Sequence, residues 1–151
     1  MTLDPRDVDD LLASIPPALE PLKADWLRLM ELAVWGDLAS GRLGATGRFR
    51  KRLLEVGEGL AGLARPRDWI PHPRERLKGA LGASIKLRDQ LELLRRAAAA
   101  VDRGADQARL HAELALFANQ LEETLTPLER QLAERLDRLH QAGRDGEDDD
   151  P

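Results

Sequence analysis

Apolar residues recur along most of the chain at intervals of three and four, the spacing that places side chains on one face of an α-helix. The predicted helices cover residues 5–15, 20–40, 46–64, 73–101 and 105–142. The pattern therefore predicts an all-α fold, a bundle of four or five helices of which most are antiparallel to their neighbours.

Prolines mark the predicted boundaries of these helices. Pro16 and Pro17 are expected to end the first helix, and Pro21 fits the first turn of the second. Residues 65–73, RPRDWIPHP, contain three prolines, which oppose regular helix and favour extended or turn conformations. This stretch therefore predicts a rigid connector between the third and fourth helices.

The last predicted helix carries the most regular apolar stripe. Its positions repeat every 11 residues, close to three helical turns, so the stripe stays on one face of a nearly straight helix. The stripe consists of Leu110, Leu114, Phe117, Leu121, Leu125, Leu128, Leu132, Leu136 and Leu139. Pro127 lies within it and predicts a kink between two halves that remain roughly collinear.

Three glycines weaken the third predicted helix, whose apolar face runs from Phe49 to Leu63. Gly57, Gly59 and Gly62 each cost about 1 kcal/mol relative to alanine. They either permit another helix to approach closely or leave this segment mobile.

Composition and length limit the class of protein. Cysteine is absent, which excludes disulfides, thiolate metal sites and a cysteine nucleophile. The acidic start MTLDPRDVDD lacks the pattern of a secretory signal, and no apolar stretch approaches the roughly 18 residues of a membrane span. We therefore expect a cytoplasmic protein without membrane association. Its 151 residues suit one domain, expected over residues 1–142 and followed by a disordered acidic tail over 143–151.

Charge is segregated along the chain. Residues 1–41 carry 3 basic and 8 acidic side chains, residues 42–96 carry 14 and 6, and residues 97–151 carry 6 and 13. A basic centre of this kind can attract an anionic partner. Alternatively, the segments neutralise one another when the helices pack.

Side chains suited to catalysis or metal binding are few and scattered. His72, His111 and His140 have no second histidine at ligand spacing, and no phosphate-loop or dinucleotide motif occurs. Adjacent carboxylates such as Glu122 and Glu123 diverge by about 100 degrees around a helix, so they do not converge on one substrate atom. We therefore expect no enzyme, no metal and no cofactor, and no small-molecule substrate is evident.

The stretch GRLGATGRFRKR, residues 41–52, is the first candidate for anion binding. Its glycines free the backbone, and the amides that begin the next helix could hold a phosphate. The alternative is an ordinary turn before a solvated helix start, in which Lys51 pairs with Glu55. That pairing does not involve Arg42, Arg48 and Arg50, which therefore remain the candidates for an anion contact in this stretch.

A second basic cluster, between Arg65 and Lys78, surrounds Trp69. The indole either offers a stacking platform, as in single-strand-binding proteins, or plugs the end of the bundle. If the two clusters share one surface, they can follow a phosphate backbone. The candidate residues for binding an anion or nucleic acid are Arg42, Arg48, Arg50, Lys51, Arg52, Arg74, Arg76, Lys78 and Trp69.

Contact with another protein is expected at two places. Trp35 falls off the apolar stripe of its helix, so it is either buried by a second neighbour or available to a partner. The last helix, about 57 Å long, exceeds the roughly 45 Å of the helix at 73–101. Its excess length predicts contact with another chain unless the amino-terminal helices cover it. The candidate contact residues are Trp35, Leu128, Leu132, Leu136 and Leu139.

These observations predict a non-catalytic assembly or adaptor protein that acts through protein–protein contacts. Its expected partner is a second copy of itself or another helical protein. The alternative is a DNA- or RNA-binding subunit that uses the basic central segment, residues 42–96.

Overall fold

Five α-helices make up most of the computed structural model, which describes residues 5–40, 44–101 and 108–148. They are α1 (Pro5–Ala13), α2 (Ile15–Ser40), α3 (Gly44–Ala64), α4 (Pro73–Ala99) and α5 (Ala108–Asp148). No β-strand occurs within these described ranges. The predicted all-α fold is therefore confirmed.

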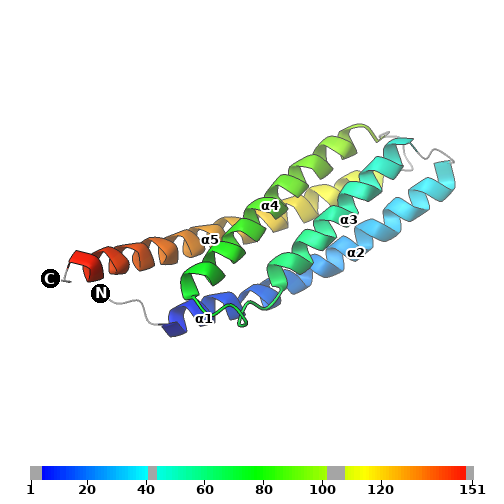
Figure 1. Cartoon of the computed structure of the whole chain (residues 1–151). Helices are drawn as coiled ribbons and strands as arrows, with labels where there is room; N and C mark the ends of the chain where they lie inside the picture. The colour runs from blue at the N-terminus through cyan, green and yellow to red at the C-terminus, as the bar shows by residue number, and fades with distance from the viewer. Residues whose placement is uncertain (1–4, 41–43, 102–107, 149–151) are drawn as a thin grey trace.

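The four long helices form a bundle in which each one contacts two neighbours. Helix α2 packs on α3, α3 on α4, α4 on α5, and α5 on α2. Consecutive long helices run in opposite directions (Figure 1). The short helix α1 lies at one end of the bundle, where it contacts α2, α4 and α5. The connector between α3 and α4, residues 65–72, lies at the same end.

The predicted apolar stripes form the core. In α3, the five stripe positions from Phe49 to Leu63 are at most 1% exposed. In α5, the stripe is buried from Leu110 to Leu132, and its last two members pack partly buried against the core. Because apolar burial is the dominant favourable term in folding, these rows of side chains account for the bundle.

The joint between α1 and α2 differs from the prediction. Helix α2 begins at Ile15 rather than at residue 20, and Ser14 alone separates it from α1. Pro16 and Pro17 therefore lie in the first turn of α2, where the N–H that proline lacks would have no helical acceptor. Pro21 lies inside the helix, not in its first turn, and cannot donate to the carbonyl one turn earlier.

Helix α5 passes through Pro127 as one continuous helix. Its 41 residues span about 60 Å, against about 40 Å for the 27 residues of α4. The helix continues to Asp148, beyond the predicted end at residue 142. The kink at Pro127 stays a prediction, as does the division of the chain into one domain and an acidic tail.

Two glycines allow α3 to approach its neighbours closely. A Cβ atom at Gly57 would lie 2.6 Å from Cε2 of Trp26 in α2, whose Nε1 donates a hydrogen bond to the Leu53 carbonyl at 2.7 Å. A Cβ atom at Gly59 would lie 2.9 Å from Cδ1 of Leu87 in α4. At these two positions, glycine therefore permits the close helix contact.

Candidate functional site

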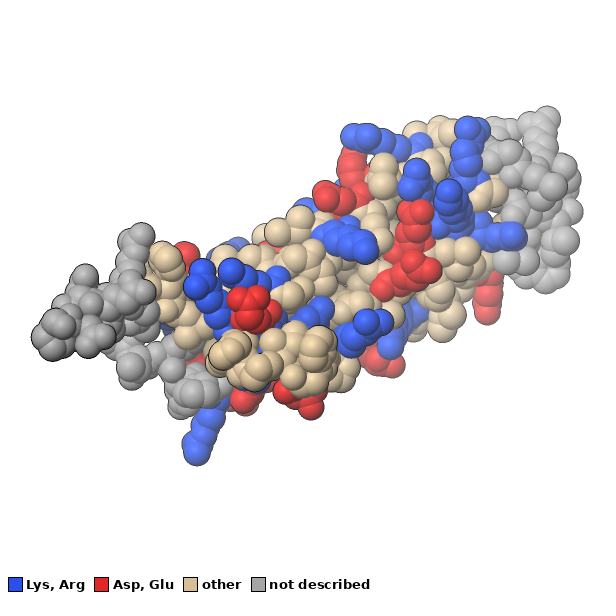
Figure 2. Space-filling model, viewed as in Figure 1, with Lys and Arg blue, Asp and Glu red and all other residues tan. Residues whose placement is uncertain are grey.

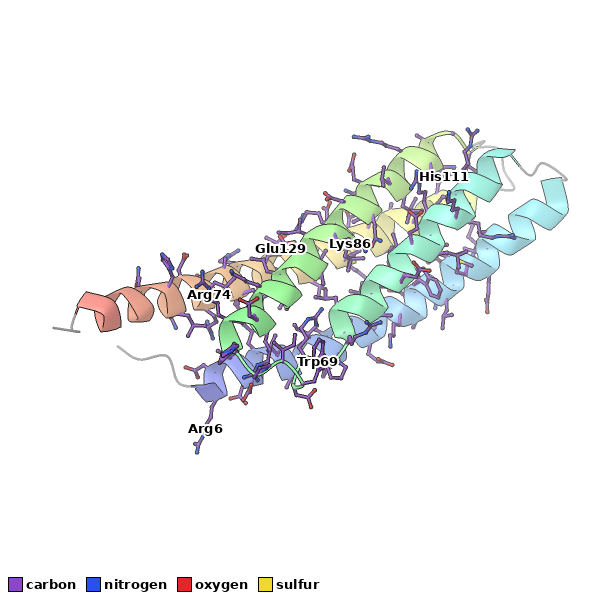
Figure 3. All side chains as sticks on the ribbon, viewed as in Figure 1. Arg6, Trp69, Arg74, Lys86, His111 and Glu129 are labelled. Carbon is purple, nitrogen blue, oxygen red and sulfur yellow. The ribbon has the colours of Figure 1, made fainter. Side chains whose placement is uncertain are left out.

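The connector presents Trp69 at the tip of a tight turn. The backbone N–H of Ile70 donates to the Arg67 carbonyl at 3.0 Å, which places Asp68 and Trp69 at the two central positions of the turn. The Trp69 side chain is 75% exposed, more than any other large apolar side chain in the described ranges. Figure 3 shows it on the connector, outside the bundle. The interpretation of Trp69 as a plug for the bundle end is therefore wrong.

Arg67 holds this turn on the bundle. Its guanidinium donates hydrogen bonds to the carbonyls of Gly62 at 2.9 Å, Leu63 at 3.1 Å and Arg65 at 3.0 Å. The first two belong to the last turn of α3, where carbonyls lack helical partners. The side chain also lies against α4, since a Cβ atom at Gly79 would be 3.2 Å from Arg67 Nε. Burial lowers the pKa of the Arg67 guanidinium and Arg65 lowers it further, but a guanidinium stays protonated at neutral pH.

A pocket of about 360 Å³ adjoins the turn. It lies where the α1–α2 joint meets the end of α3 and the connector, and most of its lining is apolar. The lining residues are Asp9, Leu12, Ala13, Ile15, Pro16, Ala64, Arg65, Pro66, Arg67, Asp68 and Arg76. Trp69 comes directly after lining residues 65–68 in the sequence but is not itself part of the lining. We call Trp69, the pocket and the exposed residues Arg65, Asp68, Arg74 and Glu75 the connector surface.

Arg76 ties α4 to α1 beside the pocket. Its Nη1 donates to Asp9 Oδ1 at 2.7 Å, and the side chains of Arg76 and Asp9 are 16% and 58% exposed. Because Asp9 is largely solvated, the pair contributes at most about 1 kcal/mol. Arg76, a candidate for anion binding, is therefore already paired within the chain.

The basic residues near the start of α3 lie on its exposed face. Arg52 forms a salt bridge with Glu55, three residues later, at 3.0 Å. This salt bridge takes the place of the predicted pair between Lys51 and Glu55. Arg42 lies outside the described residues. The remaining candidates in this stretch, all exposed, are Arg48, Arg50 and Lys51.

The structure does not bring the two basic clusters together. Residues 48–52 lie in the first turns of α3, whereas residues 65–78 follow its last turn. The 21 residues of α3 span about 30 Å. On the face shown in Figure 2, lysine and arginine side chains are interspersed with aspartate and glutamate. These residues therefore do not form one continuous basic track.

Ion pairs join the basic centre of the chain to its acidic ends. Arg88 in α4 pairs with Glu129 in α5 at 3.1 Å, and Arg95 pairs with Glu122 at 2.6 Å. The hydrogen bond from Arg95 lowers the pKa of the Glu122 carboxyl. Glu129 also accepts a hydrogen bond at 2.8 Å from the hydroxyl of the buried Ser84. Neutralisation between segments therefore occurs along the seam of α4 and α5.

The candidate protein contacts on α5 are largely covered by the chain itself. Leu132 is fully buried and Leu128 is 8% exposed. Leu136 and Leu139 are partly buried against the core. Leu128 and Leu132 therefore belong to the core, and they do not offer the free contact expected from the sequence. The Trp35 side chain lies outside the part of the chain whose side chains are described.

The described ranges contain no group of three or more His, Cys, Asp or Glu side chains that could hold a metal ion. None of the helices in these ranges combines the length and apolarity that crossing a membrane requires. Fold and site thus define a small all-α bundle with an exposed tryptophan beside an apolar pocket. The chain matches no protein-family model, no curated protein and no solved structure.

Proposed function

We propose that this chain is a non-catalytic assembly or adaptor protein that acts through protein–protein contacts, with the connector surface as its main contact. The main observation that supports this proposal is the 75% exposure of Trp69. Tryptophan is enriched among the residues that contribute most to protein interfaces, because its large ring buries much apolar area at little entropic cost. A pocket that is mostly apolar lies directly beside it.

The way in which Trp69 is held supports a binding role. Arg67 fixes the turn by two hydrogen bonds to carbonyls of α3 and one to the Arg65 carbonyl of the connector, and Pro66 and Pro71 restrict the backbone on either side. A side chain presented on a rigid turn loses little freedom when a partner binds it. This arrangement therefore favours binding over a simple solvent-exposed loop.

A retention experiment tests the proposal. The full chain is immobilised, exposed to an extract of its source cells, and compared with the Trp69→Ala variant by quantitative mass spectrometry. We expect at least one protein that wild type retains and that Trp69→Ala retains about 30-fold less, the effect of losing an interface hot spot. Leu116→Ala is the matched control, because Leu116 is also exposed, at 60%, but lies on α5 and not on the connector.

Circular dichroism checks that both variants remain folded, as expected for two exposed positions. The proposal fails if wild type and Trp69→Ala retain the same proteins in the same amounts, or if wild type retains nothing above the empty matrix.

Nucleic-acid binding is the second candidate function. It is favoured by exposed cations that have no salt-bridge partner in the described ranges, among them Arg48, Lys51, Arg74 and Lys78. Fluorescence anisotropy with labelled single-stranded and duplex DNA and RNA tests it. Binding that weakens steeply as salt is added would support this function, since phosphate contacts release counterions. Absence of binding at low salt would remove it.

A further inference from the structure

We propose that the connector surface pairs with the same surface of a second copy, so that Trp69 of each chain enters the pocket of the other. This inference rests on the proposed function, because it names the partner of the contact proposed above. It makes the chain a two-fold symmetric dimer joined end to end at the α3–α4 connectors.

The inserting group is already rigid in the single chain. Trp69 lies at a central position of the turn closed by the 3.0 Å hydrogen bond from Ile70 to Arg67. Hydrogen bonds from the Arg67 guanidinium fix this turn to α3. Trp69, labelled on the connector in Figure 3, is 75% exposed and so already lies largely in solvent. Insertion therefore requires no rearrangement of the backbone.

The receiving pocket suits an aromatic ring. Its walls include the side chains of Leu12, Ile15 and Pro66, and its volume is about 360 Å³. An apolar cavity of about 150 Å³ holds benzene, so this pocket has room for the larger indole. Removing the mostly solvated Trp69 ring from water in such a pocket is favourable.

The position of the pocket beside Trp69 determines the symmetry of the contact. Residues 65–68 line the pocket and Trp69 follows directly, so the inserting side chain and the receiving pocket occupy one patch. A patch that contains both complementary parts can pair with itself around a two-fold axis, and both contacts are then satisfied within a dimer. The assembly therefore closes at two copies.

The charges around Trp69 favour a second copy over a strongly charged partner. The connector surface carries Arg65 and Arg74 together with Asp68 and Glu75, all of them exposed and none in a salt bridge within the described ranges. An acidic partner would meet the two carboxylates, and a basic one would meet the two arginines. A two-fold rotation places this mixed patch against itself, so opposite charges can pair and like charges can avoid one another.

Analytical ultracentrifugation of the full chain over a range of concentrations tests the dimer. Trp69→Ala removes the inserting ring, and Ala13→Phe fills the pocket from an exposed position at the end of α1. A homodimer of either variant lacks both Trp69–pocket contacts, so at about 30-fold per contact each variant should weaken the dimer by about 900-fold. Leu116→Ala serves again as the control and should dimerise as wild type does.

Mixing the two variants gives the sharpest test. Trp69→Ala keeps an empty pocket and Ala13→Phe keeps a free Trp69, so one of the two contacts can form between them. At concentrations about 100-fold above the wild-type dissociation constant, the mixture should contain heterodimer while either variant alone remains mostly monomeric.

Three results would overturn the inference: a wild-type chain that stays monomeric up to its solubility limit, a dimer that Trp69→Ala leaves unchanged, or a mixture without heterodimer. If the chain is monomeric but retains a different protein through Trp69, the second copy is refuted as partner while the proposed function stands. If Trp69→Ala changes neither retention nor sedimentation, both are refuted.

Discussion

Replacing Gly57 by alanine is expected to destabilise the bundle, even though alanine favours a helix more than glycine does. The added Cβ would lie 2.6 Å from Cε2 of Trp26, so the indole must move. Movement weakens its 2.7 Å hydrogen bond to the Leu53 carbonyl, worth about 1 kcal/mol, and overpacking costs about 1–3 kcal/mol. A gain in helix propensity of about 1 kcal/mol offsets part of this loss. The free energy of unfolding should therefore fall by about 1–3 kcal/mol.

Gly62→Ala provides a matched control in the same helix. Apart from its two chain neighbours and the backbone of its own helix, a Cβ atom at Gly62 would have no atom within 4 Å, so alanine should raise the free energy of unfolding by about 0.5–1 kcal/mol. Urea unfolding followed by circular dichroism measures both effects. In a Trp26→Leu background, Gly57→Ala should lose most of its cost. Stabilisation by Gly57→Ala of the wild-type chain, equal to that by Gly62→Ala, would refute the close contact with Trp26.

Two further predictions concern the seam between α4 and α5. Glu129→Ala should lower the free energy of unfolding by about 2 kcal/mol, because Ser84 and Arg88 lose their shared acceptor. Urea unfolding measures this loss, and adding Ser84→Ala to the Glu129→Ala variant should recover part of it. If Glu129→Ala costs the same free energy with and without Ser84, the two residues are not coupled. The hydrogen bond from Arg95 lowers the pKa of the Glu122 carboxyl in the folded chain. The ionised carboxylate therefore stabilises the fold at pH values above the ordinary carboxyl pKa. This stabilisation is lost as the pH falls through the pKa that Glu122 has in the folded chain. The stability difference between wild type and Glu122→Gln should therefore shrink from pH 7 to about pH 3, and a difference independent of pH would contradict it.

The candidate site was only partly predictable from the sequence. The connector and the presence of Trp69 in it follow from the prolines of residues 65–73, but the exposure of Trp69 does not. A tryptophan between prolines can turn inward or outward, and the turn closed by Ile70 and Arg67 decides the direction. From the sequence, Arg67 was recognised only as one of the basic residues of the cluster between Arg65 and Lys78. Its position just after a helix end was a usable signal, because such residues often bond the last carbonyls.

Charge pairing was less predictable than burial. The Arg52–Glu55 pair replaced the expected pair of Lys51, since side chains three and four residues apart both lie within reach on a helix surface. The pocket was not predicted at all, because its walls come from three separate segments of the chain, residues 9–16, residues 64–68 and Arg76. Long-range pairs such as Asp9 with Arg76 have no sequence pattern that identifies them.

The sequence by itself determined the helices, the faces they bury and the all-α class, because helical periodicity is local and repeats many times along 151 residues. Only the tertiary structure decided which of those faces remain free. Leu132, which the sequence left open to a partner, is covered by the chain, and Trp69, which could have plugged the bundle, faces solvent. Burial at these positions depends on how segments far apart in the chain come together, and a periodic pattern carries no information about the order of neighbours around a bundle.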